Sequence, residues 1–201
     1  DERTFLINKC EKIIFVSNWV KEKFFEGLDR QNHSKCLTIY PSVDKIKKFP
    51  RKNNIISFVG KLNRSKGFHI FGSAIIKILN KYTDWNAIVV GDEPREKYNF
   101  KHKNLKYMGW LSHKKTLQLY NQTSISVVPS FWDEPFGRTA MESASQGCAT
   151  IISKKGGLVE TISNAVYLSD LKINNLFNKI EYLIVNRNKR LEIQKKSHKN
   201  V

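Results

Sequence analysis

The sequence lacks several features that define whole classes of protein. It has no apolar run of the roughly 20 residues that a membrane-spanning helix needs. It has only three cysteines, Cys10, Cys36 and Cys148, which are scattered and in no metal-ligand spacing. A disulfide framework and a zinc site are therefore not expected, and free thiols predict a reducing compartment, the cytoplasm.

Acidic residues are also few. Against 35 Lys and Arg there are 18 Asp and Glu, which gives a formal net charge of +17. Such an excess suits an anionic partner, such as nucleic acid, an anionic membrane surface or an acidic ligand. The lysines are dispersed, however, and no nucleic-acid motif stands out. Solvated surface charge is therefore the first interpretation, attraction to anionic lipid head groups the second, and nucleic acid the last.

Targeting signals and repeats are missing as well. Residues 1–3 read Asp-Glu-Arg, with neither an initiating Met nor a secretory signal, so we expect an excised segment or a processed form. No internal repeat, low-complexity tract or flexible linker is present. The 201 residues suffice for one domain with a full core, or for one domain plus a piece of another.

What the sequence does contain is an alternation of short apolar runs and amphipathic stretches. This alternation predicts an α/β fold, a Rossmann-like parallel sheet with helices on both faces. The expected strands are 13–16, 36–40, 55–59, 85–90, 105–108, 125–128, 149–153 and 165–168, and the expected helices 3–11, 19–28, 68–81, 113–120, 138–146, 170–185 and 188–199.

The most informative stretch is 124–147. A buried strand ends at Pro129, a loop carries Glu134, and the helix that follows carries Glu142. In open α/β sheets, ligands bind beyond the carboxyl ends of the strands. A helix N-terminus there suits an anion such as a diphosphate, and carboxylates accept hydrogen bonds from sugar hydroxyls. A nucleotide sugar has both parts.

The same stretch resembles the donor-site signature of retaining glycosyltransferases of family 4, which have the two-domain GT-B fold. That signature is a Glu, then Phe-Gly, then a second Glu with seven residues between the two, and here Glu134, Phe136, Gly137 and Glu142 take those places. The Gly-Gly-x-x-Glu that usually follows is present at 156–160. The resemblance implies transfer of a sugar, with retention, from a nucleotide-diphosphate sugar to an acceptor hydroxyl, in cell-envelope polysaccharide or lipopolysaccharide synthesis.

A second loop beside the expected site follows the strand 55–59. It begins with Gly60 and Lys61 and ends with Lys66 just before the helix 68–81, and it is neither a Walker motif nor a G-x-G-x-x-G motif. It resembles the family's Gly-Arg-Leu-x-x-x-Lys-Gly, whose Arg and Lys hold the donor diphosphate. Lys61 in place of the Arg loses a bidentate fork, so weaker binding of the diphosphate is expected.

The resemblance implies a role for each of these side chains. Lys66, Lys61 and the helix N-terminus at Phe136 and Gly137 would stabilise the charge that develops on the leaving diphosphate, with Gly60 beside it. A second set serves the hydroxyls: Glu134 would orient the donor sugar and Glu142 would bind the ribose. We therefore assign Glu134 and Lys66 to catalysis and the others to donor binding, and we expect neither a metal nor another cofactor.

Four further residues leave alternatives open. Arg138 could touch phosphate or sugar, or pair with Asp133. Trp110 could stack on the base, or serve as a buried or lid aromatic. His113 begins a helix near the site in chain order and receives no catalytic role. Glu160 is expected to position its own loop.

Residues 41–44 read Pro-Ser-Val-Asp, which resembles the phrase that opens the donor domain of the family. On this reading 1–40 are a remnant of the end of the N-terminal acceptor domain, and 41–201 are the nucleotide-sugar donor-binding domain. The missing acceptor domain is then a required partner, and the chain alone is expected to be inactive. The alternative is that 1–40 form the first βα unit of a single domain.

Other functions stay open at this point. The chain could be a non-catalytic nucleotide-sugar-binding domain, a nucleotide-sugar epimerase of related architecture, or a basic nucleic-acid-binding α/β module. The expected location is the cytoplasm, or the cytoplasmic face of a membrane if the basic surface binds anionic lipid.

Overall fold

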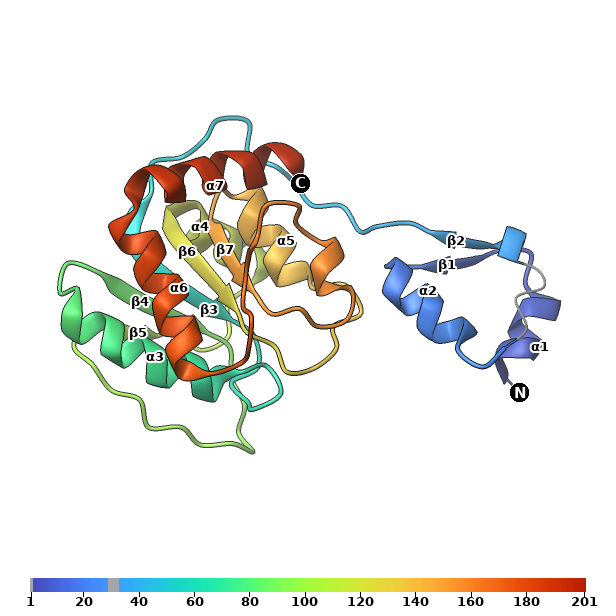
Figure 1. Cartoon of the computed structure of the whole chain (residues 1–201), viewed down its shortest axis with the longest axis horizontal. Helices are drawn as coiled ribbons and strands as arrows, with labels where there is room; N and C mark the ends of the chain where they lie inside the picture. The colour runs from blue at the N-terminus through green and yellow to red at the C-terminus, as the bar shows by residue number, and fades with distance from the viewer. Residues whose placement is uncertain (1, 29–32) are drawn as a thin grey trace.

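Most of the chain folds around a parallel β-sheet. The computed structural model describes residues 2–28 and 33–201. Figure 1 shows the sheet with helices on both faces, as the sequence predicts. Its strands are β3 (Asn53–Val59), β4 (Asn86–Val90), β5 (Leu105–Tyr107), β6 (Thr123–Val128), β7 (Ala149–Ile152) and β8 (Val166–Tyr167).

The strand order of this sheet decides where a ligand can bind. The order is β5-β4-β3-β6-β7-β8, and all neighbouring strands are parallel. This is the doubly wound order, in which the chain moves outward in one direction from β3 and then in the other from β6. The order reverses between β3 and β6, and the crevice beyond the carboxyl ends of those two strands is the expected site.

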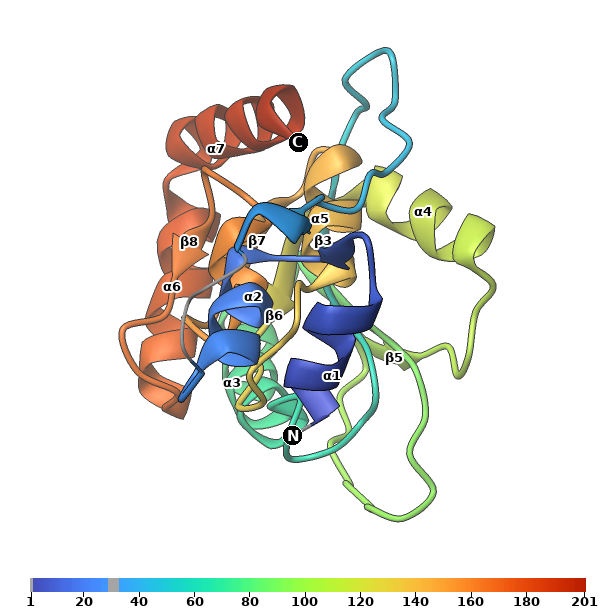
Figure 2. The ribbon, with the colours of Figure 1, turned by 90° about the vertical axis from the view of Figure 1, so that its right-hand side faces the viewer.

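Helices cover both faces of the sheet. Helices α3 (Phe68–Lys81) and α6 (Ile173–Val185) pack together on one face, and α4 (His113–Gln122) and α5 (Arg138–Ser145) on the other. Figure 2 places α6 and α4 on opposite sides of the strands. The last helix, α7 (Arg187–Asn200), packs against α5 and β7.

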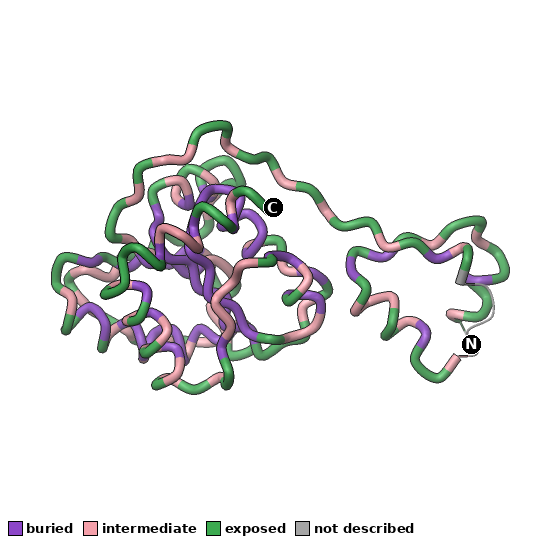
Figure 3. The backbone as a smooth tube through the Cα atoms, turned by 45° about the horizontal axis from the view of Figure 1, so that its top comes forward, coloured by how far each residue is buried: buried purple, intermediate pink, exposed green. Residues whose placement is uncertain are grey.

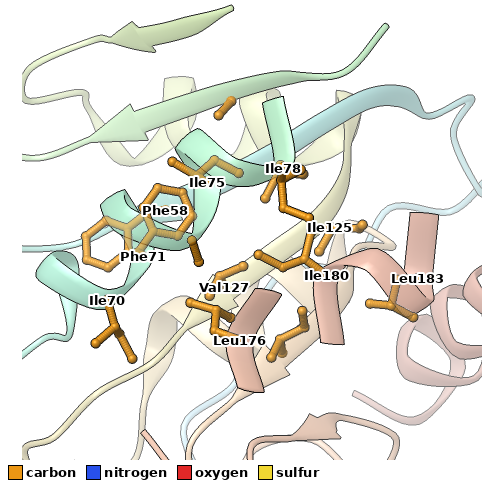
Figure 4. Close-up of a cluster of buried hydrophobic side chains, with 14 of the residues drawn as sticks. Phe58, Ile70, Phe71, Ile75, Ile78, Ile125, Val127, Leu176, Ile180 and Leu183 are labelled. Carbon is orange, nitrogen blue, oxygen red and sulfur yellow. The ribbon is translucent and has the colours of Figure 1, made fainter. Parts of the chain in front are cut away.

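The main core lies between the sheet and the α3–α6 pair (Figure 4). Phe71 and Ile75 of α3 and Ile180 of α6 are fully buried there against Phe58 and Ile125. Burial of each such side chain stabilises the fold by about 1.5–3 kcal/mol. All residues of β6 are buried, because a central parallel strand is covered on both faces. Figure 3 shows that most of the buried segments lie in and around this sheet.

The first 40 residues build a smaller unit of their own. It contains α1 (Glu2–Lys9), β1 (Ile13–Phe15), α2 (Asn18–Phe25), a 3₁₀ turn η1 (His33–Lys35) and β2 (Cys36–Thr38). Strands β1 and β2 form a separate parallel pair over a small core of Ile7, Phe15, Phe25 and Cys36. An extended segment, 39–52, joins the two units (Figure 1). That this unit belongs to an acceptor domain stays a prediction.

The predicted elements are present, with shifts at their ends. The helix expected over 19–28 ends at Phe25, just before Gly27, whose φ of 77° leaves helical space. The strand expected to reach residue 40 ends at Thr38, shortly before Pro41, which has no N–H to donate. The segment after Gly156 forms a short 3₁₀ turn, η2 (Gly157–Glu160). No described helix is both long and apolar enough to cross a bilayer.

Cys148 provides a pH test of the packing below β7. Its thiol is fully buried and donates to the carbonyl oxygens of Tyr120 (3.2 Å) and Thr123 (3.3 Å). Burial raises the pKa of the thiol from 9.0 to about 12. Between these values the unfolded chain loses the proton and the folded chain keeps it, so stability falls as pH rises.

We therefore expect the free energy of unfolding to fall by about 1 kcal/mol more in the wild type than in Cys148→Ala between pH 7 and pH 10. Urea denaturation of both proteins at both pH values measures this difference. Equal falls in the two proteins would show that the thiol ionises as readily in the folded chain as in the unfolded one.

Candidate functional site

A pocket of about 360 Å³ lies at the point where the strand order reverses. Its walls come from the ends of β3 and β6, from the loop and helix start after β6, and from the small N-terminal unit. The lining residues are Val16, Pro41, Phe58, Val59, Gly60, Lys66, Val128, Ser130, Glu134, Pro135, Phe136, Gly137, Arg138 and Thr139. The pocket therefore contains most of the residues that the sequence predicts for donor binding.

The loops after β3 and β6 hold one another in place. The carbonyl oxygen of Ser65 accepts hydrogen bonds from the backbone N–H groups of Phe131 (2.8 Å) and Trp132 (3.0 Å). Gly67 adopts a φ of 74°, and a Cβ there would lie 2.0 Å from the carbonyl oxygen of Pro129. Only glycine fits this approach, so the Gly after Lys66 lets the two loops meet.

Lys66 and Glu134 contact each other across these loops. The ammonium Nζ of Lys66 lies 2.6 Å from Oε1 of Glu134, although the two residues are 68 positions apart. Their side chains are 30% and 12% exposed, so the pair is shielded but faces the pocket. The two residues predicted to be catalytic thus form an ion pair. Their roles stay predictions, but the geometry places a cation for phosphate oxygens beside an acceptor for hydroxyls.

The N-terminus of α5 opens into the same pocket. Gly137 is the N-cap with a φ of 101°, and no side chain caps the helix. A Cβ at Gly137 would lie 2.4 Å from Cδ1 of Leu158, so the close packing there requires glycine. Because the first N–H groups of a helix have no partner within it, this end offers donors and partial positive charge to an anion.

Glu142 is buried one turn further along α5. Its Oε1 lies 3.2 Å from Nε2 of His113 and 3.4 Å from Nη2 of Arg138. The pairing of Arg138 with Asp133, which the sequence left open, is wrong, because Arg138 pairs with Glu142 one helical turn away. The sequence analysis assigned His113 no role, yet its ring contacts Glu142, the residue predicted to bind the ribose. No motif signals this contact, which arises from the packing of α4 against α5.

The Gly-Gly-x-x-Glu segment supports the loop of Glu134 from behind. The N–H of Gly157 donates to the carbonyl oxygen of Glu134 (2.7 Å), and a Cβ at Gly156 would lie 2.4 Å from the same oxygen. The hydroxyl of Ser17 donates to the carbonyl oxygen of the next residue, Pro135 (2.6 Å). The loop is therefore held from two sides, once by η2 and once by the N-terminal unit.

The carboxylate of Glu160 bonds to the N-terminal unit, whereas the sequence led us to expect that it positions its own loop. Its carboxylate accepts from the N–H groups of Asn18 and Trp19, each at 2.8 Å, and from the hydroxyl of Tyr40 at 2.9 Å. Burial and the Glu160 hydrogen bond raise the pKa of Tyr40, so that hydroxyl remains a donor. A carboxylate at the start of α2 also stabilises the helix dipole.

Loss of this carboxylate should loosen the N-terminal unit. In Glu160→Ala we expect the amides of Asn18 and Trp19 to exchange about 10- to 100-fold faster, because hydrogen bonds to a charged group contribute about 1.5–3 kcal/mol. Hydrogen exchange measured residue by residue tests this. Glu22→Ala is the control, since Glu22 is exposed on the same helix and has no ion-pair partner among the described residues. Unchanged exchange at Asn18 would show that Glu160 does not hold α2.

Three predicted donor-binding residues lie outside the pocket walls, namely the buried Glu142 and the exposed Lys61 and Trp110. Lys61 is exposed and has no ion-pair partner in the described part of the chain. Trp110 is 80% exposed and contacts no aromatic ring among the described residues. The alternative that Trp110 is a buried aromatic is therefore wrong, whereas stacking on a base or service as a lid stays a prediction.

Comparison with known families establishes the family of this chain. The model of the family described as "Glycosyl transferases group 1" matches residues 41–200, which is most of the chain. The chain belongs to the group 1 glycosyl transferases.

Individual relatives agree with this membership. Spore coat protein SA of Bacillus subtilis is 25% identical over 193 residues, which cover 80% of this chain and 51% of that protein. A crystal structure of HepE from Anabaena with UDP and glucose has a TM-score of 0.81 at 19% identity, and covers 98% of this chain and 60% of that chain. The C-terminal domain of a group 1 family protein, LpcC of Francisella tularensis, has a TM-score of 0.66 at 27% identity, with 80% and 92% covered.

These comparisons confirm the predicted fold of this group 1 glycosyl transferase and show how much of its relatives' length the chain covers. The structural neighbours are GT-B glycosyltransferases, and the parallel sheet with helices on both faces is theirs. The chain spans about half the length of the curated relatives it matches, or less. Among the described residues of this group 1 glycosyl transferase, no three His, Cys, Asp or Glu side chains are grouped to hold a metal ion.

Proposed function

We propose that the chain is the donor-binding half of a retaining glycosyltransferase of family 4, which transfers a sugar from a nucleotide-diphosphate sugar to an acceptor hydroxyl. The observation that carries this proposal is the Lys66–Glu134 pair, 2.6 Å apart, beside the free N-terminus of α5. A carboxylate beside the site would repel a ligand that is only an anion. A ligand with a diphosphate and hydroxyls can bind Lys66 through the diphosphate and Glu134 through a hydroxyl. The UDP and glucose bound to the similarly folded HepE support this ligand class.

The mechanism that follows is electrostatic. Departure of the nucleoside diphosphate builds negative charge on its phosphate oxygens. Lys66 and the N–H groups at the start of α5 are fixed in place to stabilise that charge, and such fixed donors are effective because they need no reorganisation. Lys61 adds a solvated point charge from the edge of the same loop. Glu134 accepts from sugar hydroxyls and so orients the anomeric carbon, while Glu142 serves the ribose hydroxyls.

The acceptor half of the site would come from residues beyond this chain. The small N-terminal unit exposes apolar side chains on and beside its two strands, with Ile14 60%, Leu37 43% and Ile39 54% exposed. An exposed apolar group of this kind marks a protein interface. We propose that it packs against the rest of an acceptor domain, that 1–40 are the end of that domain, and that transfer needs both. We propose the cytoplasmic face of a membrane as the setting, on the basis of the net charge of +17. Cell-envelope polysaccharide or lipopolysaccharide synthesis is the proposed pathway, on the basis of the family resemblance.

Calorimetric titration of the chain with UDP, GDP, ADP and their common sugar conjugates tests the proposal. We expect saturable binding of one nucleoside diphosphate over the others. A parallel titration with an oligonucleotide separates this from the nucleic-acid reading, which requires binding that falls steeply with salt. Binding of the oligonucleotide alone would replace the proposal. Binding of no nucleotide, including by a longer protein that contains the acceptor domain, would refute it.

A further inference from the structure

A second cavity, of about 330 Å³, lies at the opposite edge of the sheet. Asn54 near the start of β3 and Ser124 near the start of β6 line it, whereas the donor pocket lies where these two strands end. At about 3.3 Å per residue, strands of this length separate the two cavities by roughly 15–20 Å. The second cavity is therefore a different site, and donor binding in the first pocket does not depend on it.

The walls of this cavity carry four cations, Arg51, Lys52, Arg187 and Arg190, and no carboxylate. None of the four has an ion-pair partner in the described ranges 2–28 and 33–201. Burial, followed by the nearby charge of Arg187, lowers the pKa of Arg190, so the two guanidinium groups repel each other. A cavity lined by charge of one sign concentrates ions of the other sign.

Helix capping explains two of these cations. Lys52 is largely buried and donates to the carbonyl oxygens of Tyr120, Asn121 and Gln146 at the ends of α4 and α5. All three N–H groups of the Lys52 ammonium are thus hydrogen-bonded, so Lys52 contributes only its positive charge to the cavity. Arg190 donates through Nη1 to the carbonyl oxygens of two residues at the end of α6, and lies 5.0 Å above the ring of Trp85. Arg51 and Arg187 cap no helix in the described part of the chain.

Two buried side chains at the cavity have hydrogen-bonding groups to spare. Arg190 is only 7% exposed, and its Nε and Nη2 have no partner among the described residues. Gln194 is fully buried; its amide nitrogen donates to the carbonyl oxygen of Ser124 (2.8 Å), but its Oε1 accepts from nothing described. Buried polar groups are normally paired. The free N–H groups of Arg190 therefore offer hydrogen-bond donors to the oxygens of an anion in the cavity.

The start of α7 adds to this set. Its N-cap, Asn186, makes no side-chain capping bond, and its first turn holds no acidic residue. Arg187, Arg190 and Gln194 follow on one face of the helix. The free N–H groups and partial positive charge of a helix start favour an anion.

We propose that this cavity binds a phosphate group, either as free phosphate or as the phosphomonoester head group of a lipid. The phosphate oxygens accept hydrogen bonds from Arg187, Arg190 and the start of α7. Arg51 closes the cavity from the loop before β3, and Lys52 adds its charge from beneath.

NMR titration of the ¹⁵N-labelled chain with sodium phosphate, at constant ionic strength set by chloride, tests the proposal. We expect saturable shifts of the side-chain amides of Gln194 and Asn54. Arg187→Gln should raise the dissociation constant by about tenfold or more, as expected for loss of a charge-assisted hydrogen bond. Lys195→Gln is the matched control, because Lys195 is exposed on the same helix and does not line the cavity.

Sedimentation with phosphatidylcholine vesicles, with and without phosphatidic acid, distinguishes the two sources of phosphate. Binding that requires phosphatidic acid and is lost in Arg187→Gln but kept in Lys195→Gln assigns the cavity to a lipid head group. Saturable shifts with free phosphate and no such vesicle binding assign it to a soluble ligand. The proposal is overturned if neither probe binds, or if the two variants weaken binding equally. Because the NMR signals are local to the cavity, the outcome is independent of UDP binding.

Discussion

Lys66→Ala should weaken the binding of UDP to this chain by about 10- to 100-fold, because it removes a charge-assisted contact to the diphosphate. In a longer protein with the acceptor domain, turnover should fall by about two orders of magnitude or more, since the same contact strengthens as the diphosphate departs. Lys66→Arg should restore part of both, because the positive charge remains. Calorimetry with UDP measures the first effect and steady-state kinetics the second.

The control for this experiment is Lys77→Ala. Lys77 is exposed on α3, the helix that Lys66 precedes, and does not line the pocket, so its loss removes an equal charge from the same region. An equal loss of UDP affinity in both variants would mean that UDP responds to net charge alone. Unchanged affinity in Lys66→Ala would remove Lys66 from the donor site.

Glu142→Gln should lower the affinity for UDP by about tenfold or more, because the amide cannot accept from both ribose hydroxyls as a carboxylate does. The substitution keeps the size of a buried side chain, so the packing of α5 should survive. Comparison with 2′-deoxy-UDP then separates a direct role from a structural one. Removal of the 2′-hydroxyl should cost the wild type much more affinity than the variant, as in a double-mutant cycle.

His113→Ala gives the matched test of position. His113 contacts Glu142 at 3.2 Å but is itself half-exposed, so its loss should weaken UDP binding less than Glu142→Gln does. If removal of the 2′-hydroxyl costs Glu142→Gln as much affinity as it costs the wild type, Glu142 does not bind the ribose. The role would then be to hold α4 and α5 together through His113 and Arg138.

The fold could be predicted in its elements because their signals are local. The apolar stretch that became β6 and the amphipathic stretch that became α3 carry periodicities that few other structures would satisfy. The ends of the elements were less certain, because they depend on single residues such as Gly27 and on contacts made later in folding. The strand order that brings β3 beside β6 is not written in any one segment, and the alternation of strands and helices predicted only a parallel sheet.

The candidate site was predictable residue by residue but not as a set of contacts. Lys66 and Glu134 each stand out in a loop after a strand, yet their ion pair joins positions 68 residues apart. The contact of His113 with Glu142 requires two helices to lie side by side, and nothing in the His113 segment signals it. The bonds of Glu160 to α2 were missed for the same reason, since they cross between the two units.

The attachment of the N-terminal unit has a mechanical consequence. Ser17 holds the main chain of the Glu134 loop at Pro135, and Glu160 holds the first turn of α2 just after Ser17. A rotation of α2 must therefore either break these hydrogen bonds or carry Glu134 with it. Since α2 belongs to the unit that we propose continues as the acceptor domain, a force on that unit would reach the Glu134 loop through these few hydrogen bonds. Domain closure and alignment of the donor sugar would then be a single movement.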